Sequence, residues 1–303
     1  YNLENLLHYH YNCYASQLES DRPISFLREQ HSRKSPNIII KEDSSLSVPI
    51  ALKSHNNALI TTLDTIIYFR KNVGVFSIHK NGNIFYKKNT NVTDQDLFRV
   101  LLNLPIGYYF MLNKRLVIHA SCVSLNETNY LFIGKSGLGK STLAAQLVLN
   151  GYDFVTEDIC VINDENGVLT SFPLIKIKNK QIENNLNYKS KYYFESDSKR
   201  RHGFLLDDNY FAKKLCTKNL NSLLLTDKKI ETKKACPSNF ENFNHFLDSV
   251  FLPRPLNKNK ELASELISKA ASFYKKNEFN SFGLDNGYEF RNNEIKASIG
   301  FKL

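Results

Sequence analysis

The segment of residues 134–141, Gly-Lys-Ser-Gly-Leu-Gly-Lys-Ser, constrains the fold of this chain more than any other. It fits the phosphate-loop (Walker A) pattern G-x-x-x-x-G-K-[ST] at every fixed position. A short apolar segment, residues 130–133, precedes it, and residues 142–149, which favour a helix with an apolar stripe, follow it. Strand, glycine loop and helix in this order are the context that the pattern requires. The sequence therefore predicts an α/β fold around a nucleotide site.

The loop predicts which residues bind the nucleotide. Glycines let backbone N–H groups turn inward onto phosphate oxygens, and the helix N-terminus adds partial positive charge. Lys140 is placed to reach the β- and γ-phosphates, and the Ser141 hydroxyl is placed to ligate magnesium. The predicted nucleotide-binding residues are Gly134, Lys135, Ser136, Gly137, Leu138, Gly139, Lys140, Ser141 and Thr142. A chance glycine-rich turn is the alternative, and the flanking segments argue against it.

The segments around the loop predict a mixed sheet. Residues 115–125 read as one strand, residues 126–129 as a turn, and residues 130–133 as the strand that feeds the loop. The loop strand then forms a hairpin with its predecessor, whereas parallel neighbours need helical crossovers. This pattern favours a less common class of phosphate-loop kinase.

Two adjacent acids follow the loop helix. Residues 154–158 predict the next strand, which ends in Glu157 and Asp158. At the end of a strand beside the loop, one carboxylate could hold magnesium with Ser141, and the other could accept a proton from an attacking hydroxyl. A solvated strand end is the alternative. His119, on the preceding strand, would lie near these acids, although a single strand histidine is usually structural.

At these residues the sequence resembles the HPr kinase/phosphorylase family in its kinase-domain portion. The resemblance rests on Ile-His-Ala-Ser-Cys-Val-Ser at 118–124, on residues 132–144 around the loop, and on Gly-Tyr-Asp-Phe-Val-Thr-Glu-Asp at 151–158. The likeness is greatest to HPr-kinase-like proteins beside peptide-modifying gene clusters, including lasso-peptide tailoring kinases. It implies a phosphate-loop kinase fold of the HPr kinase/PEP carboxykinase-like type.

The resemblance also implies chemistry and roles. It implies phosphorylation of a serine hydroxyl that depends on ATP and Mg²⁺. Asp158 matches the second acid, the base, and His119 matches the histidine that faces the phosphate and the acids. Glu157 stands where the family usually has Asp, which implies a metal ligand with a longer arm. The HPr-binding loop is not found here, which argues against HPr as substrate and against phosphorolysis.

The rest of the chain predicts three parts. Residues 1–35 are hard to interpret. Residues 36–114 predict a small antiparallel β-rich module with one helix at 94–104, capped by Thr93 or Asp94 and ended by Pro105. Residues 115–303 predict the kinase domain, with helices at 239–252 and 261–275.

Composition limits the partners. The net charge is +10, and residues 176–234 hold 15 Lys and Arg against 7 Asp and Glu. This basic segment, predicted to be irregular before residue 219, favours an anionic partner, and a lysine-rich background is the alternative. Within it, Arg200 or Arg201 could supply charge to the transition state or the acceptor. Five scattered cysteines favour a reducing cytoplasm. Neither a nucleic acid nor a membrane is expected as a partner, and oligomerisation is left open.

Three functions are open at this point. The first is a kinase for a serine of a peptide or small protein, with a ribosomal natural-product precursor as one candidate. The second is a kinase for a small-molecule hydroxyl, such as that of a sugar or an amino acid. The third is a nucleotide-binding regulator without transfer activity. This alternative is disfavoured, because the residues needed for transfer are all present: Lys140, Ser141 and the acid pair.

Overall fold

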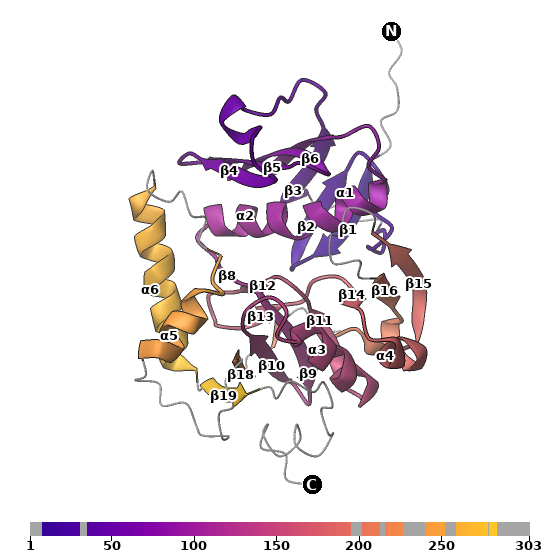
Figure 1. The fold of residues 1–303 in the computed structure, drawn as a ribbon, viewed down its shortest axis with the longest axis vertical. Helices are drawn as coiled ribbons and strands as arrows, with labels where there is room; N and C mark the ends of the chain where they lie inside the picture. Colours follow the sequence, from indigo (N-terminus) through magenta and orange to yellow (C-terminus); the bar gives the residue numbers. More distant parts are fainter. Residues whose placement is uncertain are drawn as a thin grey trace.

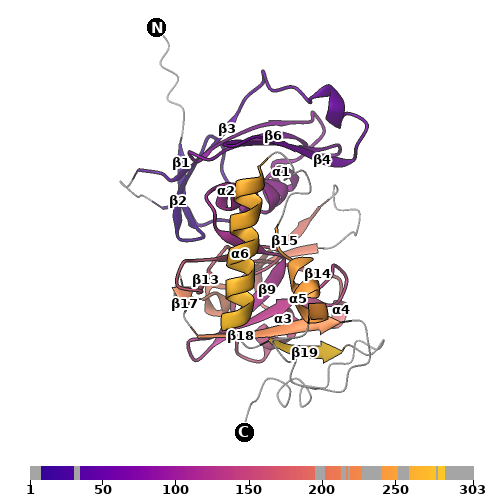
Figure 2. The same ribbon diagram turned by 90° about the vertical axis from the view of Figure 1, so that its left-hand side faces the viewer.

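The structure is a computed structural model that describes residues 8–30, 35–194, 202–212, 216–217, 219–226, 240–251, 259–277 and 279–283. Figure 1 shows two halves, the N-terminal half (residues 8–112) above and the C-terminal half (residues 116–283) below. Helix α6 (Lys260–Lys276) runs along one flank and reaches the level of both halves, as the view in Figure 2 also shows.

The N-terminal half is built on a seven-stranded sheet. Its order is β1-β2-β3-β7-β6-β5-β4. Its strands are β1 (Tyr9–Cys13), β2 (Ser16–Ser20), β3 (Ile38–Glu42), β4 (Asn57–Thr61), β5 (Thr65–Arg70), β6 (Gly74–His79) and β7 (Asn83–Lys88), and the short 3-10 helix η1 (Ile50–Leu52) precedes β4. The β-rich character predicted for residues 36–114 is confirmed by β3 to β7. The prediction of a purely antiparallel module is wrong, because β3 pairs in parallel with both β2 and β7.

Two helices cover one face of this sheet. Helix α1 (Asp94–Leu101) begins as predicted, with the Thr93 side chain accepting a hydrogen bond from the Asp96 amide at 3.1 Å. The prediction of one helix at 94–104 that Pro105 ends is wrong, since α1 ends at Leu101 and Pro105 lies in the first turn of a second helix, α2 (Leu104–Leu112). Proline is tolerated there because an N–H in the first turn has no helical partner.

The loop strand lies in the middle of a five-stranded mixed sheet of order β11-β9-β10-β18-β19. These strands are β9 (Ala120–Leu125), β10 (Thr128–Ile133), β11 (Asp153–Thr156), β18 (Asn219–Thr226) and β19 (Phe279–Gly283). Strand β10 pairs antiparallel with β9 and parallel with β18, which confirms the predicted hairpin and mixed sheet. Strand β11, which leads into Glu157 and Asp158, is separated from β10 by β9, so it is not the immediate neighbour that the sequence predicts.

Helices cover both faces of the five-stranded sheet. Helix α3 (Lys140–Leu149) shares a core with Tyr130 and Phe132, while Leu131 and Ile133 share a second core with α6 and α5 (Phe240–Leu247). Alternate residues of one strand therefore point into two different cores, as in a sheet buried on both faces. This three-layer arrangement fixes the carboxyl end of β10, where the loop begins. The predicted helices at 239–252 and 261–275 are confirmed, and residues 284–303 of the predicted kinase domain lie outside the described residues.

The predicted strand at 115–125 is interrupted. Its first part, β8 (Leu116–Ile118), belongs to a separate four-stranded sheet of order β17-β13-β12-β8, and only its second part, β9, pairs with the loop strand. The other strands of that sheet are β12 (Cys160–Ile162), β13 (Val168–Leu169) and β17 (Cys216–Thr217). His119 lies at the junction, where its amide donates to the Ser249 carbonyl at 2.7 Å. The break therefore puts His119 between two sheets.

Residues 174–193 and 202–206, predicted to be irregular, form a further sheet of three strands, so that prediction is wrong for them. Its order is β14-β16-β15. Its elements are β14 (Leu174–Ile177), helix α4 (Lys180–Asn185), β15 (Tyr188–Tyr193) and β16 (His202–Leu206), and the 3-10 helix η2 (Asp208–Tyr210) follows. Ile175 and Ile177 of β14 join the core under α3. Strand β14 is thereby placed beside the start of the loop helix.

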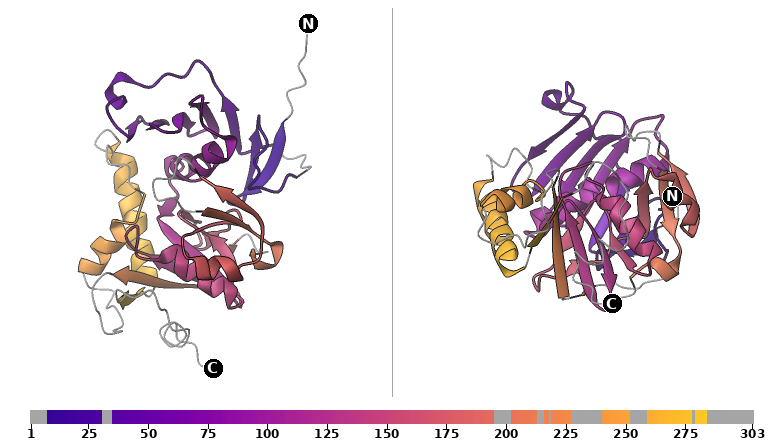
Figure 3. Two further views of the ribbon diagram at one scale, coloured as in Figure 1. Left: turned by 45° about the vertical axis from the view of Figure 1, so that its right-hand side comes forward. Right: turned by 60° about the horizontal axis from the view of Figure 1, so that its bottom comes forward.

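One core extends across both halves. It joins the N-terminal strands and α2 to Ile159, Val161 and Phe172 of the C-terminal half. The β1–β2 hairpin contributes Tyr14, whose side chain is 1% exposed and whose amide donates to the Thr170 carbonyl at 3.0 Å. Both panels of Figure 3 show the N-terminal strands on one side of the C-terminal half and α6 on another. No helix among the described residues is long and apolar enough to cross a membrane. The predicted domain boundaries stay a prediction.

Candidate active site

The phosphate loop has the backbone that its glycines permit. Gly134 has φ 155°, and a Cβ atom there would come within 2.8 Å of the Leu225 carbonyl oxygen, so only glycine fits beside β18. Gly139 has φ 82° and caps α3, which begins at Lys140. Positive φ is readily adopted only by glycine. The loop therefore turns directly from the sheet into the helix, and the α3 N-terminus lies where phosphate oxygens bind in phosphate-loop proteins.

Lys140 is folded back over its own loop. Its Nζ donates to the carbonyl oxygens of Gly134 at 2.7 Å and Lys135 at 3.0 Å, and the residue is buried. These bonds hold the ammonium group at the loop, within the region that phosphates occupy in proteins of this kind.

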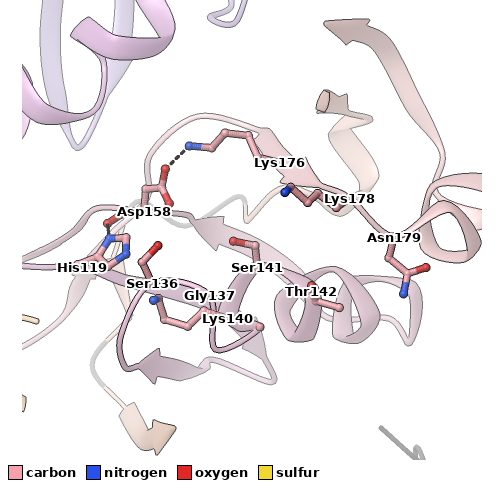
Figure 4. A pocket seen from close by; sticks show the side chains of 11 residues that line it. His119, Ser136, Gly137, Lys140, Ser141, Thr142, Asp158, Lys176, Lys178 and Asn179 are labelled. Atoms are coloured by element: carbon pink, nitrogen blue, oxygen red, sulfur yellow. Dashed lines mark hydrogen bonds and ion pairs between the residues drawn. The ribbon is translucent and has the colours of Figure 1, made fainter. Parts of the chain in front are cut away.

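A cavity of about 480 Å³ opens over the loop. It is lined by His119, Ser136, Gly137, Gly139, Lys140, Ser141, Thr142, Asp158, Lys176, Lys178 and Asn179. Figure 4 shows side chains from the loop, from His119 and Asp158, and from the strand opposite converging on this space. Of the nine loop residues predicted to bind nucleotide, Gly134, Lys135 and Leu138 are not among those that line it. Volume and lining suit a phosphorylated small molecule.

Asp158 occupies a tight turn at the end of β11. Its φ is 65°, and the Ile159 amide donates to the Glu157 carbonyl at 2.8 Å, which closes a three-residue turn around Asp158. The Thr156 hydroxyl braces the turn by donating to the Ile159 carbonyl at 2.6 Å. A left-handed residue at the centre of so short a turn is strained, and such strain concentrates at functional sites. Here the turn directs the Asp158 side chain into the cavity.

The same turn sends Glu157 elsewhere. Its side chain is buried and accepts a hydrogen bond from the backbone amide of Lys176 at 2.8 Å. It is not among the residues that line the cavity. The two adjacent acids, which the sequence expects to share one site, are thus separated by the bend between them. Magnesium binding by Glu157 stays a prediction, and the geometry favours a role in holding β14.

His119 faces the acid turn. Its Nδ1 lies 2.8 Å from the Asp158 carbonyl oxygen, which can only accept, so Nδ1 carries the hydrogen. Burial lowers the pKa of His119, and the nearby Lys140 ammonium lowers it further, while Asp158 opposes the shift. The imidazole is therefore neutral at pH 7, and in this tautomer Nε2 is a hydrogen-bond acceptor. The predicted proximity of His119 to Asp158 is found in the structure.

Lys176 is a cavity residue that the sequence did not single out. It forms an ion pair with Asp158, with the two side chains 4% and 22% exposed respectively. The one sequence signal for it is a lysine between two isoleucines in the apolar segment of residues 174–177. Interpreting the region as irregular leaves this signal unused. Lys178 and Asn179, which follow on the same segment, were missed for the same reason. Arg200 and Arg201 lie outside the described residues.

The donor groups fit a magnesium–nucleotide complex. Mg²⁺ in kinase sites is typically held by one or two carboxylates together with substrate phosphates and water, not by an all-protein cage. Ser141 lines the cavity and could supply one oxygen ligand there, with the nucleotide phosphates and water supplying the others. The described part of the chain contains no cluster of three His, Cys, Asp or Glu side chains that could hold a metal alone.

Comparison with known proteins supports the reading of the motifs. No family model matches the chain. A curated relative, the HPr kinase/phosphorylase of Mycoplasmopsis pulmonis (strain UAB CTIP), is 28% identical over 96 residues. The chain resembles the HPr kinase/phosphorylase family. The matched segment covers 32% of this chain and 29% of the relative, so the chain spans under a third of that protein's length.

A solved structure, the Hpr(Ser) kinase/phosphatase from Coxiella burnetii, is 11% identical to this chain. The likeness covers 60% of this chain and 86% of that one, with a TM-score of 0.30. The fold class is evident from this chain's own structure, where a phosphate loop follows the central strand of a mixed α/β sheet and a β-rich half precedes it.

Proposed function

We propose that this chain is a phosphotransferase that moves the γ-phosphoryl group of ATP to a serine hydroxyl of a peptide or small protein. One observation carries the proposal. A single cavity of about 480 Å³ brings the phosphate-loop residues Lys140 and Ser141 together with the carboxylate of Asp158. Phosphoryl transfer needs little more than phosphate binding, positive charge and a positioned proton acceptor.

The reaction follows from these positions. The acceptor hydroxyl oxygen forms a bond to the γ-phosphorus while the bond from that phosphorus to the β–γ bridging oxygen breaks, and the electron pair leaves with ADP. The hydroxyl proton passes to the Asp158 carboxylate, which acts as general base. Lys140 and the loop amides bind the β- and γ-phosphates. Magnesium, held by Ser141 and the phosphates, would supply charge that offsets the negative charge of the nucleotide.

His119 orients the reacting groups in this scheme. Its Nδ1–H is committed to the Asp158 carbonyl oxygen, so the ring holds the turn whose carboxylate takes the hydroxyl proton. Because burial and Lys140 lower its pKa, the ring adds no positive charge that would compete with magnesium. His119 is therefore a positioning residue that holds the Asp158 turn in place.

The proposed acceptor is a peptide serine. The family resemblance supports a protein hydroxyl, and the basic segment 176–234 supports an acidic partner. Lys178 and Asn179 at the cavity put part of that segment beside the reacting groups. A ribosomal natural-product precursor is the acceptor to test first, since the motifs look most like those of kinases beside peptide-modifying clusters.

The test is a transfer assay read by intact mass. Candidate precursor peptides, and serine-containing metabolites in parallel, are incubated with the protein, ATP and Mg²⁺. We expect a mass increase of one phosphoryl group on a peptide serine, and its near-complete loss with Lys140→Ala, because the loop then lacks its phosphate-binding ammonium. Circular dichroism of Lys140→Ala establishes that the variant is folded.

The other outcomes separate the alternatives. Transfer to a sugar or amino-acid hydroxyl and not to peptides would make the protein a small-molecule kinase. Nucleotide binding without transfer to any acceptor would make it a regulator. Unchanged turnover in folded Lys140→Ala would show that the loop is not the nucleotide site, and the proposal would fail.

A further inference from the structure

The ion pair between Lys176 and Asp158 is unusual for its position. Lys176 lies on β14 between Ile175 and Ile177, which pack into the core under α3, and its side chain is 4% exposed. Burying an ammonium group is costly, and a buried ion pair often stabilises a protein no more than apolar residues of similar size. Stability alone therefore does not account for a lysine at this position.

The cavity supplies the remaining argument. Among the described residues that line it, Asp158 is the one carboxylate, while Lys140, Lys176 and Lys178 bring positive charge. Lys140 and Lys176 approach from different sides, since Lys140 begins the loop helix and Lys176 comes from the strand opposite. A nucleoside triphosphate bound to the loop would therefore have a second ammonium group, that of Lys176, near its γ-phosphate on the side of Asp158.

We infer that Lys176 binds the γ-phosphate of the nucleotide, and that its ion pair with Asp158 is the arrangement it adopts before the nucleotide arrives. This inference rests on the proposed function. While Lys176 holds the Asp158 oxygen, that carboxylate is a poor proton acceptor. When the ammonium group moves to the γ-phosphate, it stays protonated and adds charge to the transferring group, and Asp158 becomes available to the acceptor hydroxyl. Lys176 thereby couples the presence of a γ-phosphate to activation of the base.

Fixed contacts make such an exchange feasible. The Lys176 amide is held by the buried Glu157 side chain at 2.8 Å, and β14 pairs with β16 on its other side. The backbone therefore stays in place while the long side chain turns. Asp158 is likewise held by the Ile159–Glu157 hydrogen bond and by the His119 contact to its carbonyl oxygen. Only the Lys176 ammonium group has to change partner.

The experiment compares nucleotides with and without a γ-phosphate. Affinities for AMP-PNP, a non-hydrolysable ATP analogue, and for ADP are measured with Mg²⁺ by isothermal titration calorimetry. We expect Lys176→Met to weaken AMP-PNP binding about 10- to 100-fold, the usual range for losing a hydrogen bond to a charged group. ADP affinity should stay within about twofold, because that ligand has no γ-phosphate for Lys176 to contact. If both affinities fall equally, or neither falls, the inference is wrong.

A double variant separates contact from charge balance. If Lys176 only neutralises Asp158, then Lys176→Met harms ATP binding through repulsion by the carboxylate, and adding Asp158→Asn restores AMP-PNP affinity. If Lys176 contacts the γ-phosphate, the double variant binds AMP-PNP as weakly as Lys176→Met. Restored affinity in the double variant therefore overturns the inference.

Two further variants guard the result. Lys176→Gln keeps a polar end that can donate to Asp158, and it gives the same readout should Lys176→Met fail to fold. Lys189→Met is the matched control, because Lys189 on β15 of the same sheet forms an exposed ion pair with Asp208 at 2.7 Å. Absence of AMP-PNP binding by the unmodified protein would defeat the proposed function itself. If the unmodified protein binds AMP-PNP, and Lys176→Met leaves the ratio of the AMP-PNP and ADP affinities unchanged, only the inference about Lys176 is wrong.

Discussion

The phosphate loop and strand β14 face each other across the cavity, yet they are built in different ways. The loop is a contiguous segment whose strand, glycines, lysine and serine follow one another within residues 130–142. Strand β14 acquires its place from distant partners, through pairing with β16 and through the contacts of Lys176 to Glu157 and Asp158. The phosphate-binding residues are thus neighbours in the sequence. The surroundings of Asp158 are formed instead by residues that are distant in the sequence.

The two lysines express this difference. Lys140 donates to carbonyl oxygens of its own loop, within six residues along the chain. Lys176 pairs with a carboxylate 18 residues away, across a break between two sheets. Removing Lys140 disturbs one loop, whereas removing Lys176 changes the partner of Asp158. If this contrast holds, variants on the loop side should change nucleotide binding, and variants on the β14 side should change the reaction at Asp158.

Asp158→Asn has the largest expected effect on the far side of the cavity. Asparagine keeps the size of the side chain but cannot take a proton, so kcat should fall roughly 10²- to 10⁴-fold, the usual range for a positioned general base. ADP affinity should stay close to normal, because ADP rests on the loop. Steady-state kinetics and calorimetry on one preparation measure both. Recovery of the rate with excess Mg²⁺ would instead identify Asp158 as a metal ligand.

Glu157→Gln has a smaller expected effect, and on a different property. Glutamine can still accept from the Lys176 amide but without a full charge, so the free energy of unfolding should fall by about 1 kcal/mol. The Mg²⁺ concentration for half-maximal rate should not change, because the Glu157 side chain is buried beside β14. Urea denaturation and a magnesium titration measure the two quantities.

Glu157→Asp, which keeps the charge on a shorter arm, is the control for Glu157→Gln. A severalfold higher Mg²⁺ requirement in Glu157→Gln, with stability unchanged, would contradict the geometry and support the metal role that the family resemblance implies.

The parts of the molecule predicted from sequence are those encoded by neighbouring residues. The loop, the β9–β10 hairpin, the strands of residues 38–88 and helices α5 and α6 follow from glycine patterns, turn residues and apolar periodicity. The proximity of His119 to Asp158 follows from its place on the preceding strand and from the family resemblance. Each of these depends on a short stretch of chain or on a motif of fixed spacing.

The parts that were missed depend on long-range pairing. Strand β14 has four residues with a lysine at the third, which gives no periodicity, and it forms a strand because β16 pairs with it from residues 202–206. The break at His119 arises because β8 and β9 join different sheets. The side chains of Glu157 and Asp158 point to different places because Asp158 has a positive φ, and no residue pattern in the sequence predicts that φ. Tertiary contacts, not local propensity, decide these three features.

The smallest expected effect compares the two lysines through His119. Burial is the main cause of its lowered pKa, Lys140 is the second, and Lys176 contributes least among the groups acting on it. Removing either positive charge should raise the pKa of His119, and Lys140→Met should raise it more than Lys176→Met. The imidazole Cε1–H resonance, followed by NMR against pH and assigned by its absence in His119→Gln, measures both shifts.

The same order should appear in stability. Because the pKa of His119 is lower in the folded protein than its ordinary 6.5, the unfolded chain binds more protons below that pH, and the free energy of unfolding falls as the solution is acidified through 6.5. Each variant that raises the pKa makes this fall shallower, most of all Lys140→Met, and His119→Gln removes its contribution altogether. Urea denaturation between pH 5 and pH 8 measures the slope. If the free energy of unfolding changed less with pH in Lys176→Met than in Lys140→Met, the predicted order would be wrong. The pKa of His119 would then depend more on the Lys176 charge than on the Lys140 charge.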